Sequence, residues 1–193
     1  MKVPTLDRAL ITLLAGALLV TLQPCFAQPH QSQIASDLQL FENKEKGYRL
    51  LLPKGWKTKT DLIVDVIAAP EETFKQPNPI PNIKVVVKPI PTGHTLDTIS
   101  DTAIRQWAAI WKVESDKKIE LGSIPMRKLV LLQTLKLPTD TEQPVRQQTK
   151  ILKAFATSGD QYFIISCSNY EANFEKTHEL FNRVVESLLM LKK

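Results

Sequence analysis

The sequence predicts an α+β domain, a largely antiparallel β-sheet of about six to seven strands flanked by helices. Three observations support this fold class. Stretches in which apolar and polar residues alternate follow one another between residues 48 and 168, as in half-buried strands. Short turns join many of these stretches, so neighbouring strands are expected to pair antiparallel. Two further stretches, after residue 95 and after residue 171, repeat their apolar residues at helical spacing.

The first strand is expected at Tyr48–Pro53, because a glycine precedes it and the sequence Pro-Lys-Gly-Trp ends it. Trp56 is expected to plug the end of this strand. A tight, glycine-containing hairpin is expected at residues 158–160. The same kind of pattern predicts the other strands at residues 62–68, 83–90, 118–123, 127–137, 146–157 and 161–167.

Two helices are expected to cover the sheet. Thr95 is a favourable N-cap, and the apolar spacing that follows it continues to about Val113, so this helix should lie flat against the sheet. The second helix runs from Glu171 to Lys193 and closes the chain. Its apolar stripe consists of Phe174, Phe181, Val184, Val185 and Leu188.

A proline-rich segment, Glu71 to Asn82, lies between two of the expected strands. Three prolines in twelve residues fix several backbone angles, which predicts a long, stiff surface loop without a central strand or helix. Loops of this length often carry function. Phe74, Lys75 and Asn78 are therefore candidates for contacting a partner.

The N-terminus has the pattern of a secretory signal peptide over residues 1–27. Ala9 to Val20 is an unbroken apolar run that is too short to span a bilayer and matches the apolar region of such a signal. We expect cleavage after Ala27, a flexible leader at residues 28–40 and a single domain at residues 41–193. Two alternatives stay open, acylation at Cys25 and an uncleaved anchor. Lipidation is the less expected outcome, because Gln23 and Pro24 stand where small residues usually precede the acylated cysteine.

Composition and charge exclude several classes of protein. With 43% hydrophobic and 23% charged residues, the chain is an ordinary globular protein. A net charge of +5 without a basic cluster argues against nucleic acid as a partner. Cleavage would leave Cys167 as the sole cysteine, which rules out an internal disulfide. The strand pattern places Cys167 on one face with Phe163 and Ile165, so we expect a buried, inert thiol.

The sequence contains no recognisable catalytic motif. It has no G-x-S-x-G elbow, no glycine-rich phosphate loop, no H-E-x-x-H and no C-x-x-C, and we therefore expect neither enzymatic activity nor a cofactor. Glu171, Glu175 and His178 share one part of the last helix and are weak candidates for a metal site, with a solvated polar edge as the alternative. Trp107 and Trp111 are candidates for contacting a ligand or partner, although such spacing on a helix is more often part of a core.

The segment GYRLLLPKGW, residues 47–56, resembles the opening strand of the PsbP family and of its relatives, the DcrB-like exported proteins. The end of the chain is similar as well. Tyr162-Phe163-Ile164-Ile165 resembles the family's last strand, and residues 169–188, with Phe174 and Phe181, resemble its closing helix. The likeness covers about Phe41 to Leu191. It implies a PsbP-like α/β sandwich.

The resemblance also implies an extracytoplasmic role without catalysis. PsbP proteins sit on the lumenal side of photosystem II and help to assemble or steady the oxygen-evolving site. We therefore expect a monomeric accessory or assembly protein that docks on a membrane-associated or envelope complex, peripheral to the membrane at most. Its location would be the periplasm, or the thylakoid lumen if the source is photosynthetic. The alternative is a carrier of a small ligand or metal that uses a cleft between the first helix and the sheet.

Overall fold

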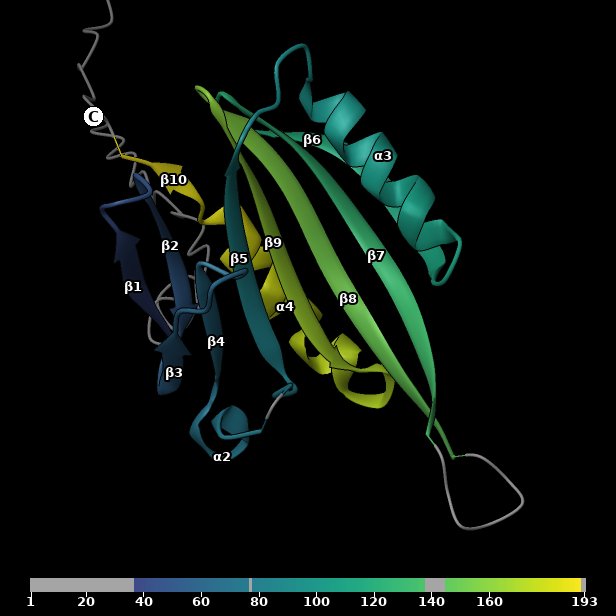
Figure 1. The fold of residues 1–193 in the computed structure, drawn as a ribbon. Coiled ribbons are helices and arrows are strands. Elements are labelled where there is room, and N and C mark those ends of the chain that lie inside the picture. Colours follow the sequence, from purple (N-terminus) through teal and green to yellow (C-terminus); the bar gives the residue numbers. More distant parts are fainter. Residues whose placement is uncertain (1–36, 77, 138–144, 192–193) are drawn as a thin grey trace, which may run out of the picture.

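The computed structural model describes residues 37–76, 78–137 and 145–191. They form a seven-stranded antiparallel sheet in the order β3-β4-β5-β9-β8-β7-β6 and a three-stranded antiparallel sheet in the order β1-β2-β10 (Figure 1). The strands are β1 (Leu38–Asn43), β2 (Tyr48–Pro53), β3 (Trp56–Lys59), β4 (Val66–Pro70), β5 (Asn82–Pro89), β6 (Lys112–Leu121), β7 (Ile124–Leu137), β8 (Val145–Ser158), β9 (Gln161–Tyr170) and β10 (Leu189–Met190). The helices are α2 (Glu71–Phe74), α3 (Leu96–Ala108) and α4 (Glu171–Glu186).

The two long helices lie on opposite faces of the large sheet, which confirms the predicted α+β class (Figure 1). Helix α3 packs on β6, β7 and β8, whereas α4 packs on β8, β9 and the small sheet's β2. A separate apolar cluster forms on each side. Any group that binds on one face is therefore separated from the other face by a complete layer of sheet.

The main core fills the space between the large sheet, α4 and the small sheet. Tyr48, Phe163, Phe174 and Phe181 are among its fully buried side chains. Cys167 is also fully buried there, and this burial raises the pKa of its thiol, so the thiolate that would react is disfavoured. The prediction that Cys167 is a buried thiol facing the core is confirmed.

The smaller cluster lies beneath α3 and contains Leu129, Leu131, Ile151 and Phe155. At the edge of this cluster, Arg127 links α3 to the sheet through polar contacts. Its guanidinium donates to Asp116 on β6 at 2.8 and 2.7 Å, and to Ser100 on α3 at 3.0 Å, and it also contacts Asp101 on α3. The position of α3 therefore depends on both apolar and ionic contacts.

Several predicted boundaries at the N-terminal end of the domain are wrong. Strand β1 begins at Leu38, so the last part of the expected flexible leader at 28–40 is strand, paired with β2. The remainder of that leader and the signal peptide at residues 1–27 lie outside the described residues. The strand expected at 62–68 is Val66–Pro70 instead, and Trp56 belongs to its partner β3. A turn occupies the residues between β3 and β4.

Both helix ends were also predicted too far along the chain. The first helix ends at Ala108, and β6 starts at Lys112, because the residues that follow pair with β7. The last helix ends at Glu186, after which β10 pairs with β2. The segment expected as an irregular loop at Glu71 to Asn82 begins with the one-turn helix α2. Glu71 and Glu72 favour this turn, because acidic side chains stabilise a helix start.

Candidate functional site

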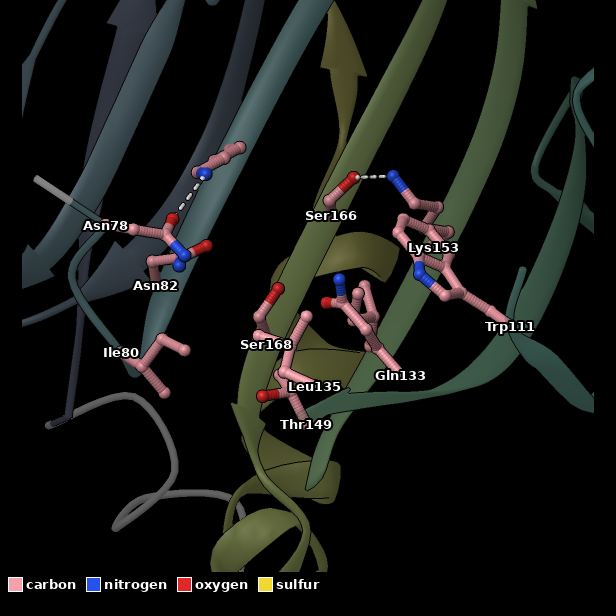
Figure 2. Close-up of a pocket in the computed structure, with 12 residues that line it drawn as sticks. Asn78, Ile80, Asn82, Trp111, Gln133, Leu135, Thr149, Lys153, Ser166 and Ser168 are labelled. Atoms are coloured by element: carbon pink, nitrogen blue, oxygen red, sulfur yellow. Dashed lines mark hydrogen bonds between the residues drawn. The ribbon is translucent and has the colours of Figure 1, made fainter. Parts of the chain in front are cut away.

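A cavity of about 190 Å³ opens on the face of the large sheet that carries α3 (Figure 2). Four neighbouring strands form its floor, and the Asn78–Ile80 segment and Trp111 lie at its sides. This volume is smaller than the 300 to 1,000 Å³ typical of pockets for drug-sized ligands, so it suits a small group. Its lining residues are Asn78, Ile80, Asn82, Lys84, Trp111, Gln133, Leu135, Thr149, Ile151, Lys153, Ser166 and Ser168.

Strand register brings the polar residues of the floor together. Ser166 on β9 is the partner of Lys84 on β5 and also of Lys153 on β8. Directly opposed residues in a sheet lie on the same face. The floor therefore carries a row in the order lysine, serine, lysine, and the next row contains Asn82 and Ser168.

Among the residues of the floor, Lys153 has the most strongly lowered pKa. Its Nζ donates to Ser166 Oγ at 2.9 Å and lies 4.3 Å from the centroid of the Trp107 ring. Burial, the larger cause, and the positive charge of Lys84 together lower the pKa of Lys153 to about 8. The lysine is held as a cation largely by a neutral hydroxyl and an aromatic face.

Lys84 is in a comparable position on the other side of β9. Its Nζ donates to Asn78 Oδ1 at 3.0 Å. Burial lowers the pKa of Lys84, as does the positive charge of Lys59, while Asp61 acts in the opposite sense. Within the described residues, neither Lys84 nor Lys153 forms an ion pair with a carboxylate.

Two polar atoms in the cavity lining have no hydrogen-bond partner among the described residues. They are Oδ1 of Asn82 and Oγ1 of Thr149, and both residues are almost completely buried, with exposed fractions of 2% and 3%. The amide nitrogen of Asn82 donates to the carbonyl oxygen of Pro79, which assigns the other end of the amide as the free acceptor. Buried polar atoms without partners are costly unless water or a ligand satisfies them.

Three of the five residues proposed from sequence for partner contact meet at or beside this cavity. Asn78 and Trp111 line it, and Trp107 stacks on Trp111 with ring centroids 6.1 Å apart. Phe74 and Lys75 do not line it. Phe74 is half-buried with Lys59 Nζ 5.2 Å from its ring centroid, and Lys75 is exposed.

The three residues proposed as weak metal ligands do not form a metal-binding group. His178 Nδ1 is 4.0 Å from Glu175 Oε2, and Glu175 also lies 3.7 Å from Lys150. Over the described ranges, no three or more histidine, cysteine, aspartate or glutamate side chains come together in a way that could hold a metal ion. No helix in the same part of the chain is long and apolar enough to cross a membrane.

Sequence reasoning missed the two lysines of the cavity. A signal was present, because Lys84 and Lys153 each interrupt an apolar run, in IKVVV and ILKAFA. A lysine inside such a run is unusual, because lysine side chains are almost never fully buried, and it therefore indicates a candidate site. Their proximity could not be recognised without the pairing of both strands with β9.

A second unusual surface lies at residues 60–65, which we call the apolar turn. Leu62 and Ile63 are adjacent at its tip, and their exposed fractions are 103% and 76%. The backbone N–H of Asp61 donates to the carbonyl of Val64 at 3.0 Å, which closes the turn. Asp65 anchors it, because Oδ2 accepts from the backbone N–H of Val87 on β5 at 2.6 Å.

Comparison with known proteins shows which family and which solved structures this chain resembles. The family model described as PsbP matches residues 36–190. A search of curated protein sequences found no match. The chain resembles the solved structure of cyanobacterial PsbP, CyanoP, from Synechocystis sp. PCC 6803, with a TM-score of 0.60 and 16% identity over 80% of this chain and 92% of that one.

Other similar structures share the fold at lower identity. One is LpqN of Mycobacterium tuberculosis, described as involved in cell envelope biogenesis, with a TM-score of 0.56 and 10% identity over 80% of this chain and 92% of that one. Another is the Saccharomyces cerevisiae Ran-binding protein Mog1p, with a TM-score of 0.54 and 12% identity over 80% and 96% of the two chains. At these identities the likeness concerns the fold alone.

Proposed function

This chain belongs to the PsbP family, and from that premise we propose that it is an exported, non-enzymatic accessory protein that docks on a membrane-associated protein complex. The pattern of residues 1–27 supports export to the periplasm, or to the thylakoid lumen if the source is photosynthetic. The CyanoP likeness supports an accessory role of the PsbP kind. In this proposal the chain is a monomer that meets its partner through a surface.

The observation that carries the docking proposal is the exposure of the apolar turn. Two adjacent aliphatic side chains project into solvent, which costs free energy unless a partner covers them. The surface hollow beside Leu62 and Ile63 is bordered by charges of both signs, two lysines and two aspartates. An apolar pair with a mixed charged border fits a partner surface that has an apolar centre and a polar rim. The anchoring of Asp65 to β5 holds the turn in position before binding, which reduces the entropy cost of docking.

The docking proposal is tested by photo-crosslinking from the turn. A benzoylphenylalanine residue at position 62 of the full chain, expressed in its source, is expected to crosslink to a subunit of a membrane complex. Position 40 is the matched control, because Leu40 is also an exposed leucine, at 60%, but lies on β1 of the small sheet. The same adducts at both positions, or none at position 62, would show that the turn is not the docking surface.

Ser166 and Lys153 form a hydrogen-bonded serine–lysine pair, and some hydrolases use such a pair as nucleophile and base. A pKa near 8 leaves the lysine mostly protonated at neutral pH, and Ser166 accepts its hydrogen bond. A lysine with this pKa is neutral in about a tenth of the molecules at pH 7, and enzymes use lysines with a pKa of about 7 to 8 as bases. We propose that Lys153 serves as a half-buried cation of the cavity, and hydrolysis assays of Ser166→Ala and Lys153→Met test whether it also acts as a base.

A second candidate function, carriage of a small ligand, is supported by the cavity itself. The cavity lies on the sheet face that carries α3 and is lined by Trp111, which follows the helix, although no residue of α3 itself lines it. Docking and carriage use different surfaces, because the apolar turn does not line the cavity. Variants of one surface can therefore be tested without changing the other.

A further inference from the structure

We propose that the cavity beside α3 binds a small oxyanion, a carboxylate or phosphate group that also carries a hydrogen-bond donor. The inference deepens the carriage function and does not depend on docking through the apolar turn.

Charge is the first argument for an oxyanion. Lys84 and Lys153 both lie in the cavity, and within the described residues neither has a carboxylate within 4 Å. Two like charges held near each other at half-buried positions repel and lose part of their hydration, so each favours an anion. Their strands flank β9, which puts the two backbones about 10 Å apart. A small oxyanion can lie between side chains of that reach.

Unsatisfied hydrogen bonds are the second argument, and they define the ligand further. Thr149 Oγ1 has no partner and can donate to an anionic oxygen, as can the hydroxyl groups of Ser166 and Ser168. Asn82 Oδ1 can only accept. It would repel a bare anion but would accept from an O–H or N–H group of the ligand. A hydroxycarboxylate or a hydrogen phosphate satisfies both requirements.

The shape and polarity of the cavity walls also favour an oxyanion. Ile80, Leu135 and Trp111 border the polar floor (Figure 2). Apolar borders lower the local dielectric around the lysines, which strengthens their attraction for an anion. A cavity of about 190 Å³ has room for several atoms beyond the oxyanion, because one water occupies about 30 Å³ of liquid. The ligand is therefore expected to carry a short polar or aliphatic body.

The test is an NMR titration of the isotope-labelled full chain with inorganic phosphate and, separately, with malate, at constant ionic strength set by sodium chloride. At least one of the two is expected to shift the amide signals of residues 82–84, 149–153 and 166–168 with saturation. Phosphate alone would identify a phosphate group as the ligand chemistry, and malate alone a carboxylate. Acetate, which lacks a donor hydroxyl, is expected to bind more weakly than malate.

Variants connect the shifts to the lysines. Lys84→Met and Lys153→Met are each expected to weaken binding about tenfold or more, because each removes a charged hydrogen-bond donor. Lys88→Met is the matched control, since Lys88 lies on the same strand as Lys84 but outside the cavity lining, and its affinity should stay within about twofold. Amide spectra of the free variants report whether each is folded.

Three outcomes would overturn the proposal. The first is no saturable shift with phosphate or malate. The second is an equal loss of affinity in Lys88→Met, which would indicate general charge attraction. The third is a set of shifts located outside the cavity. None of these outcomes bears on crosslinking from position 62, so the docking proposal and the oxyanion site fail independently.

Discussion

Replacing Arg127 with alanine is expected to lower the free energy of unfolding by about 2 kcal/mol, because it removes the hydrogen bonds of a largely buried guanidinium to charged partners. The Arg127 side chain is only 11% exposed and bonds to Asp116 on β6 and to Ser100 and Asp101 on α3. Its loss removes the ionic contact that joins the helix to two strands. Urea unfolding monitored by circular dichroism measures the change.

The same arginine makes stability depend on pH in a defined direction. Hydrogen bonds from Arg127 lower the pKa of Asp101 and that of Asp116. A carboxyl whose pKa is lower in the folded state contributes stability that is present above its unfolded pKa, near 4, and is lost as the pH falls through the folded value. Arg127→Ala should therefore lose less stability than the wild type on acidification below about pH 4.

Arg105→Ala is the matched control, because Arg105 lies on the exposed side of α3 and bonds only to Thr102 among the contacts described. Its effect should stay within about 0.5 kcal/mol. Equal effects of the two arginine variants would contradict the assignment of Arg127 as the anchor of α3. An unchanged acid slope in Arg127→Ala would do the same.

Replacing Lys153 with methionine is expected to raise the free energy of unfolding by about 2 kcal/mol near neutral pH. A pKa lowered from 10.5 to about 8 corresponds to roughly 3 kcal/mol against the buried cation, at about 1.36 kcal/mol per unit. The variant also loses the contact of Nζ with the Trp107 ring, which offsets about 1 kcal/mol. Methionine keeps an unbranched apolar stem of similar length over that ring.

The gain should shrink as the pH rises. Below about pH 8 the folded wild type carries the full cost of the charged lysine, and the cost is relieved as the pH rises from the folded pKa towards the unfolded value near 10.4. The wild type and Lys153→Met should therefore approach equal stability by about pH 10. Lys88→Met, at an exposed position, should not show this convergence. If Lys153→Met is less stable than the wild type at all pH values, the charge of Lys153 does not lower the stability of the folded protein, and this explanation is wrong.

The large sheet could be predicted from the sequence because its strands bury one or both faces. Alternation in β5, β7, β8 and β9 follows the pleat, and the predicted ranges at 83–90, 127–137, 146–157 and 161–167 lie within a few residues of the observed strands. In the small sheet, β2 was predicted at its observed bounds, Tyr48–Pro53, whereas β1 and β10 were not predicted. Strand β10 has two residues and directly follows a helix, so it has no period of its own.

The errors at the end of the first helix arose at apolar residues whose spacing fits both a helix and a strand. Trp111 and Val113 continue the helical spacing but also alternate, and pairing with β7 decides in favour of the strand. Leu62 and Val64 extend the alternation of Val66 and Ala68, which predicted a strand, yet the turn closed between Asp61 and Val64 exposes Leu62 and its neighbour Ile63. The cavity depends on the register of four strands, which no local sequence pattern contains.

The central claim is that this protein acts by binding and performs no covalent chemistry, and Ser166 beside Lys153 is the place to test it. Hydrolysis of p-nitrophenyl acetate by the purified full chain, by Ser166→Ala and by Lys153→Met measures this directly. The account predicts rates equal to the buffer background for all three proteins. Turnover by the wild type above background that is abolished in both variants would contradict it.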